Sequence, residues 1–228
     1  MKKLAVILMG LLLMCSTGAS NVFASTVYTN DFESGSLGAI QNAQVKETEG
    51  YKNHGFGDYY AWSDAKETNA ITLQLNDLPE HSYLKIEFDL AVINSWDGNK
   101  NEWWHWWEPD YFNVKVDGTS IFHETFSNFD KSDQSYSGDP IVWNKKLART
   151  SGWPDSAYHI SLEIPHTSDT AKITWFASGT DYAWQGGWDE SYAIDNIKVF
   201  AAVPIPASAW ILGSGLLGLV AIRRKMVE

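Results

Sequence analysis

A run of aromatic residues, Trp103-Trp104-His105-Trp106-Trp107, is the part of this sequence with the clearest capacity for recognition chemistry. Exposed indole rings form flat platforms for the apolar faces of sugar rings, and nearby carboxylates accept hydrogen bonds from sugar hydroxyls. The pattern therefore indicates a polysaccharide site built from Glu102, Trp103, Trp104, Trp106, Trp107 and Asp110. Two alternatives stay open: the rings fold back as a buried lid, or they meet a membrane interface, where the flanking acids would be repelled by anionic lipid.

Acidic residues also occur close to both ends of the chain's central part. The stretch Asn30–Gly35 and the stretch Ala193–Val199 resemble the first and last strands of jelly-roll carbohydrate-binding modules and related bacterial surface domains. That resemblance implies a structural Ca²⁺ held by Glu33 and Asp195, with Asp31 and Asp58 as weaker ligands. Terminal strands that lie side by side would let carboxylates converge on one hard cation. The alternative is that these are solvated acids and an Asx-type turn.

A second acidic set lies around the tryptophan run. The segments Ser95–Asn99, Pro109–Phe112 and Asp189–Tyr192 resemble a group of uncharacterised secreted jelly-roll domains, which informs the fold more than the function. If the acids of these segments gather at one end of the fold, they would form a second cation site. Their other interpretation is turn formation, which is frequent for Asp in β proteins.

Sequence signs of catalysis are weak. Glu87 and Asp89 share one face of an expected strand, as the paired acids of some glycosidases do, but Val92 stands where such motifs need a further glutamate. The six histidines are scattered without zinc-ligand spacing, and no G-x-S-x-G elbow is present. The sequence therefore predicts a protein that is not an enzyme.

The elements that must position these residues read as strands throughout. Period-two alternation is clearest over Tyr83–Ile93, and Asp117-Gly118 between two apolar stretches predicts a tight hairpin. No segment between residues 26 and 200 sustains a helical apolar stripe. We expect an all-β fold, a two-sheet antiparallel β-sandwich of the jelly-roll type. The strands expected are 27–32, 70–75, 83–93, 111–116, 121–126, 158–164, 171–177 and 192–200.

The N-terminus has the composition of a Sec signal peptide. Two lysines precede an apolar stretch from Leu4 to Met14, and small residues end the segment at Ala24. We expect a signal helix in residues 1–24 that is removed on export. Cleavage there also removes Cys15, the single cysteine, so the exported chain would have no disulfide.

The C-terminus carries a short apolar run that ends in basic residues. Residues 203–228 closely resemble the VPLPA variant of the PEP-CTERM sorting signal: the box is Val203, Pro204, Pro206 and Ala207 with Ile205 inside it, and the basic cluster is Arg223, Arg224 and Lys225. The apolar run is short for a membrane helix, which needs roughly 17–25 residues. The resemblance implies a Gram-negative host, an exosortase partner, transient inner-membrane anchoring and delivery to the cell surface or extracellular matrix.

Between these tails, residues 25–202 are enough for one domain. Removing the five basic and one acidic residues of the tails from 17 basic and 28 acidic residues leaves 12 and 27, a net charge of −15. Such a surface disfavours nucleic acid as a partner. The sequence thus predicts an exported, non-catalytic module that binds polysaccharide or exopolysaccharide and is stabilised by Ca²⁺. A structural matrix protein without a specific glycan site, and a polysaccharide hydrolase or lyase, remain alternatives.

Overall fold

A computed structural model of the chain describes residues 22–99, 109–148, 152–179, 184, 186–187 and 189–204. Residues 1–21 of the expected signal helix, and nearly all of the expected sorting tail, lie outside these residues. Residues 22–24 belong to strand β1, so the expectation of a helix is wrong for that end of the segment. No helix within the described ranges is long and apolar enough to cross a membrane. The strands are β1 (Val22–Asn30), β2 (Ile40–Gln41), β3 (Gln44–Glu47), β4 (Tyr59–Ser63), β5 (Ile71–Leu75), β6 (Tyr83–Asn94), β7 (Tyr111–Val116), β8 (Thr119–Thr125), β9 (Pro140–Lys145), β10 (Asp155–Pro165), β11 (Ala171–Ser178) and β12 (Glu190–Pro204).

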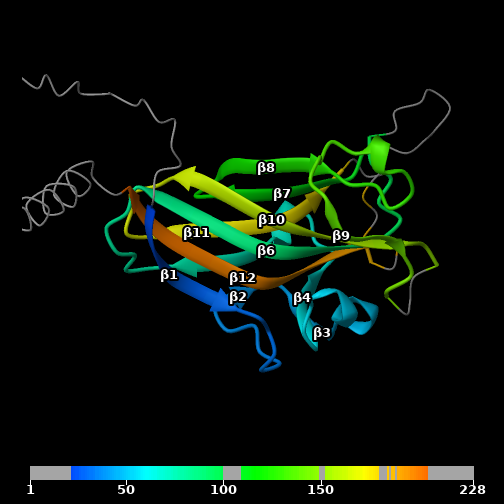
Figure 1. Cartoon of the computed structure of the whole chain (residues 1–228), viewed down its shortest axis with the longest axis horizontal. Coiled ribbons are helices and arrows are strands. Elements are labelled where there is room, and N and C mark those ends of the chain that lie inside the picture. Colours follow the sequence, from blue (N-terminus) through cyan, green and yellow to red (C-terminus); the bar gives the residue numbers. More distant parts are fainter. Residues whose placement is uncertain are drawn as a thin grey trace, which may run out of the picture. The chain divides into compact units, whose positions relative to one another are not determined.

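The strands form two antiparallel sheets that pack face to face as a β-sandwich (Figure 1). One sheet has the order β3-β4-β12-β6-β10-β9, and β1 also pairs with β12. The other has the order β2-β5-β11-β7-β8. The predicted two-sheet sandwich is therefore confirmed, and the first and last strands are neighbours. Three short 3₁₀ helices, η1 (Glu49–His54), η2 (Glu67–Asn69) and η3 (Lys131–Asp133), occur in the described connections.

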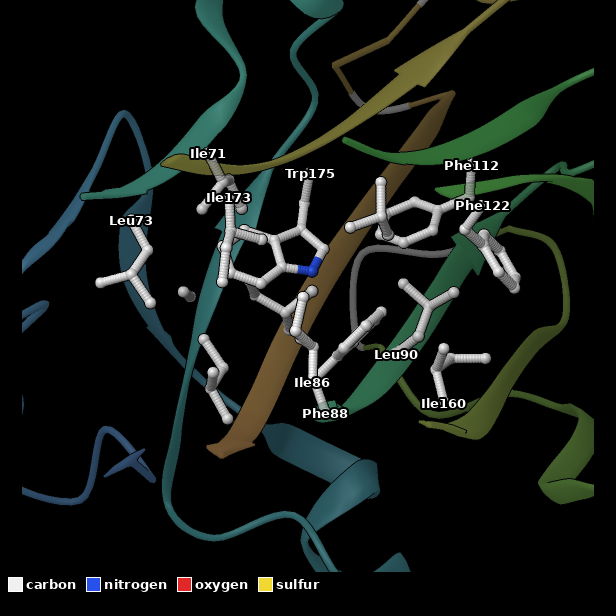
Figure 2. Close-up of a cluster of buried hydrophobic side chains, with 14 of the residues drawn as sticks. Ile71, Leu73, Ile86, Phe88, Leu90, Phe112, Phe122, Ile160, Ile173 and Trp175 are labelled. Atoms are coloured by element: carbon white, nitrogen blue, oxygen red, sulfur yellow. The ribbon is translucent and has the colours of Figure 1, made fainter. Parts of the chain in front are cut away.

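The main core lies between the two sheets. Leu84, Ile86, Phe88, Leu90 and Val92 alternate along β6 and are all fully buried. Figure 2 shows Ile86, Phe88 and Leu90 from β6 and Ile160 from β10 facing a second layer from β5, β7 and β11, with Trp175 at its centre. Each such side chain contributes roughly 1.5–3 kcal/mol on burial.

The other face of β6 is less exposed to solvent than the alternation of its residues predicts. Lys85, Glu87 and Asp89 are partly exposed, as expected, but Ala91 and Ile93 on the same face are buried. They belong to a second cluster in which η1 contributes Tyr51 and the adjoining turn contributes Phe56. The alternation of buried and partly exposed residues therefore holds only in the first half of β6, because η1 and the turn after it cover the second half.

The hairpin between β7 and β8 is confirmed. Asp117 and Gly118 have φ values of 50° and 81°, the positive pair that a two-residue turn of the I′ type requires. The Asp117 side chain also accepts a hydrogen bond from Lys172 N at 2.8 Å, which ties the turn to β11. Four strands were missed from the sequence, β2, β3, β4 and β9. They are short, and β4 has adjacent buried residues because η1 packs against it.

Candidate functional site

The expected tryptophan platform cannot be placed. Glu102, Trp103, Trp104, Trp106 and Trp107 lie outside the described residues. Asp110, at the base of that loop, is described and fully buried. Its carboxylate therefore lies inside the domain and not on the surface expected for a sugar contact.

Other tryptophans in or beside loops occupy different environments. Trp184 is buried, and its Nε1 donates to Asp64 O at 3.1 Å. Trp143 is partly buried, and its Nε1 donates to Ser127 O at 3.0 Å. Trp153 is 49% exposed and packs edge-on against Phe129, with ring centroids 5.7 Å apart. Trp188 lies outside the described residues.

The chain brings Glu33 and Asp195 to the same backbone segment. Glu33 Oε1 accepts hydrogen bonds from Asp58 N at 2.6 Å and Tyr59 N at 3.1 Å. Asp195 Oδ2 accepts one from Gly57 N at 3.3 Å. A side chain at position 57 would collide with the Glu33 carboxylate, so glycine is what permits this approach. The two acids expected to hold Ca²⁺ thus face one turn between η1 and β4.

The environment of Asp195 is strongly acidic. Its burial, with a smaller effect of the charges on Asp89 and Glu33, raises the pKa of the Asp195 carboxyl to about 7 despite hydrogen bonds from the N–H groups of Asn196 and Gly57. Asp89 is held by His159 Nδ1 at 2.7 Å and by Asn196 Nδ2 at 2.8 Å. In the sequence, Asp89 stands out only as one of two acids on a strand face, with Glu87. Its place opposite Asp195 in the β6–β12 register could be found only from strand pairing.

The two weaker metal candidates do not join this group. Asp31 Oδ1 accepts a hydrogen bond from Glu33 N at 3.2 Å, which is the Asx-type turn of the alternative interpretation. Asp58 forms an ion pair with Lys52. In the described ranges, no group of three His, Cys, Asp or Glu side chains has the spacing of a metal site. Calcium binding by Glu33 and Asp195 therefore stays a prediction.

A surface pocket that the sequence reading missed lies beside β4. It has a volume of about 300 Å³, and its lining is Asn42, Ala43, Gln44, Trp62, Ser63, Asp64, Ala65 and Asn69. Trp62 is partly exposed, and Lys46 Nζ lies 2.9 Å from the centroid of its ring. The Asp64 carboxylate accepts a hydrogen bond from Gly187 N at 3.0 Å.

The lining groups have the chemistry of a sugar site. An indole ring offers an apolar surface, while the amides of Asn42, Gln44 and Asn69 and the carboxylate of Asp64 offer donors and acceptors. These polar residues come from several elements: Asn42 precedes β3 and Gln44 begins it, whereas Asp64 follows β4 and Asn69 ends η2. In the sequence, the feature that could have indicated this pocket is Trp62, a single tryptophan within Tyr59–Ser63. It is less conspicuous than the run at Trp103–Trp107.

No family model and no curated protein matches the chain. Among solved structures it is similar to the K2 cleaved adhesin domain of Lys-gingipain, with 13% identity, coverage of 79% of this chain and 98% of that one, and a TM-score of 0.39. It is also similar to TmCBM61 in complex with β-1,4-galactotriose, with 13% identity, coverage of 80% and 89%, and a TM-score of 0.31.

A third similarity is to a cycloisomaltooligosaccharide glucanotransferase of Paenibacillus sp. complexed with cycloisomaltoheptaose. The identity is 15% and the TM-score is 0.34, and the match covers 70% of this chain but only 16% of that protein. Similarities of this extent identify neither a ligand nor an activity for the present chain.

Proposed function

We propose that this protein is an exported, non-catalytic polysaccharide-binding module of the cell surface or extracellular matrix. The observation that carries the proposal is the pocket beside β4, whose lining residues include Trp62, Asp64 and three residues with amide side chains. Its volume of about 300 Å³ is at the small end of ligand pockets and suits one or two sugar rings of a longer chain. The polysaccharide would therefore be bound at a short segment and not enclosed.

Recognition in this pocket follows from simple chemistry. The apolar face of a sugar ring packs on the Trp62 indole, and its hydroxyls exchange hydrogen bonds with Asp64 and the nearby amides. Stacking on the face occupied by the Lys46 ammonium requires that flexible side chain to turn aside. Asp64 keeps its position during binding because Gly187 N holds it.

The proposal includes a structural Ca²⁺ at the meeting point of the first and last strands. Glu33 and Asp195 would supply carboxylate oxygens, which are the ligands that Ca²⁺ prefers. The fit rests on the excess of negative charge there: a buried Asp195 lies near both Glu33 and Asp89, and its carboxyl pKa is raised to about 7. A bound divalent cation would offset that charge and connect the turn after β1 to β12 through Glu33 and Asp195.

The route to the surface is proposed from the two tails. Residues 1–24 would direct export, and residues 203–228 would engage an exosortase and hold the chain transiently in the inner membrane of a Gram-negative bacterium. A chain cut after Ala24 keeps Ser25, whose Oγ donates to Ala201 O on β12 at 3.4 Å, so the strand contact would survive processing.

The test is retention on polysaccharide affinity gels, with Trp62→Ala compared against Trp153→Ala. We expect Trp62→Ala to weaken binding by about tenfold, the upper range for one aromatic contact, because the stacking surface is lost. Trp153→Ala removes an exposed tryptophan outside the pocket and should leave affinity unchanged. If neither calcium-loaded nor calcium-free protein is retained by any polysaccharide, the proposal fails.

A further inference from the structure

Four carboxylates gather where two long connections leave the sandwich. Asp97 follows β6 and pairs with Ser127 in an isolated bridge, Asp110 directly precedes β7, and Asp189 and Glu190 lead into β12. β6 and β12 are adjacent, with Glu190 opposite Asn94. We call these four residues the loop-base carboxylates.

Asp110 is the most constrained of the four. Its side chain is fully buried, and Oδ2 accepts a hydrogen bond from Asp97 N at 3.3 Å. Oδ1 is buried and has no hydrogen-bond partner within the described part of the chain. A buried carboxylate oxygen without a partner is costly, so this atom marks a place where a ligand would be stabilising.

The other three acids surround it with like charge. Burial, then the charge of Glu190, and then those of Asp97 and Asp189 raise the pKa of the Asp110 carboxyl to about 9, while the hydrogen bond from Asp97 N lowers it. Glu190 is itself buried, and its Oε2 accepts a hydrogen bond from Gly186 N at 3.4 Å. The four acids are therefore close enough to affect one another's ionisation, with Asp110 and Glu190 buried and Asp97 and Asp189 partly exposed.

We infer that the loop-base carboxylates form a calcium site, separate from Glu33 and Asp195, that fixes the bases of both connections. The donors are all carboxylate oxygens, which favours a hard cation over zinc. Ca²⁺ suits the arrangement because it accepts six to eight oxygen ligands in irregular geometry, including water and backbone carbonyls. Mg²⁺ demands a near-ideal octahedron that four acids from three segments do not supply.

Binding requires these side chains to draw together. In the described ranges, no three acidic or histidine side chains already surround one point at ligand spacing. Asp97 and Asp189 are partly exposed and lie at the ends of connections, so they have room to move. Asp110 and Glu190 are anchored beside strands and would be the fixed ligands.

Two buried tryptophans adjoin the site and can report on it. Trp96 lies next to Asp97 in the chain, and its Nε1 donates to Ser191 O at 2.9 Å. Its ring is 5.0 Å from that of Trp184. The connection that starts at Asp97 and ends at Asp110 also carries the Trp103–Trp107 run, so an ion here would fix the two ends of that segment.

The test uses the full-length chain, calorimetric titration with CaCl₂, and terbium luminescence sensitised by tryptophan. The wild type should bind one ion more than Asp110→Asn/Glu190→Gln, and the double variant should lose the sensitised signal. Glu33→Gln should keep that signal, since it affects the other proposed ion. Asp97→Asn and Asp189→Asn change partly exposed positions. Each should lower the affinity for the ion that gives the sensitised terbium emission by about tenfold or more, because a charged ligand is lost.

A second readout guards against misfolding of the double variant. Asp110→Asn should leave the melting temperature in EDTA close to that of the wild type at pH 7, because a carboxyl group with a pKa of about 9 is already neutral there, and it should abolish the stabilisation by calcium at this site. Near-ultraviolet circular dichroism checks that the core remains native. Calcium binding that is unchanged in both partly exposed variants, or a wild type without tryptophan-sensitised terbium emission, would overturn the inference. The sugar pocket at Trp62 plays no part in either result.

Discussion

At the scale of single residues, this protein buries acidic side chains whose ionisation is disfavoured. Asp195 and Asp110 are both fully buried, and both carboxyl pKa values are raised, to about 7 and about 9. Burial is the largest cause in each case, and neighbouring acids add to it. Such groups weaken the folded state unless a proton or a cation offsets the charge.

Stability in the absence of calcium should therefore fall as pH rises. The Asp195 carboxyl has a pKa of about 7 in the fold against an ordinary value of 3.8, so the folded state holds the proton more tightly between these values. Its contribution is fully present below pH 3.8 and is lost as pH rises through 7. The difference amounts to about 4 kcal/mol.

Urea unfolding in EDTA across this pH range measures the effect. Asp195→Asn should reduce the fall of the unfolding free energy with rising pH, because the amide does not titrate. His159→Gln should leave most of that fall unchanged. A wild type whose unfolding free energy rises from pH 5 to 7 in EDTA would contradict the reading of a buried, protonated Asp195.

At the scale of elements, turns and close approaches decide where side chains meet. Glycine at position 57 lets Glu33 lie against the turn before β4, and the positive φ values at Asp117 and Gly118 close the β7–β8 hairpin. Asn196 also has a positive φ of 51°, at the irregularity in β12 between Asp195 and Lys198. That irregularity sits directly after the proposed calcium ligand, as bulges often do beside sites.

The hairpin offers a clean test of one such turn. Gly118→Ala should destabilise the protein by about 1 kcal/mol, because φ at this position is 81° and an alanine there is strained even though its Cβ meets no atom within 4 Å. Gly152→Ala is the matched control, since it also meets nothing within 4 Å but has no positive φ. Equal melting temperatures for the two variants would show that the turn is not under this constraint.

At the scale of the whole molecule, the sandwich makes neighbours of residues at opposite ends of the chain. β1 pairs with β12. Glu33 and Asp195, which are 162 positions apart in the chain, both accept hydrogen bonds from the turn at Gly57 and Asp58. An ion held there would connect the first and last strands, which are the elements most exposed to fraying. The fold and the proposed ion would therefore support each other.

Calcium should accordingly raise the melting temperature of the whole domain. An ion that binds only the folded state adds about 2.7 kcal/mol at a concentration one hundred times its dissociation constant. Differential scanning calorimetry in EDTA and in saturating CaCl₂ measures the shift, and Glu33→Gln should reduce it without altering the melting temperature in EDTA by a comparable amount. Identical wild-type curves in the two buffers would rule out both proposed ions.

The all-β class, the alternating core face of β6 and the Asp117-Gly118 hairpin could be predicted from the sequence alone, because they depend on local periodicity and turn chemistry. The sequence also pointed to Glu33 and Asp195. Only the tertiary structure decided that Asp89 joins them, that Asp31 and Asp58 turn to local partners, and that Trp62 lines a pocket. These outcomes depend on strand register and on which short elements cover the sheets, and such contacts join residues too distant in the chain for any local pattern to record.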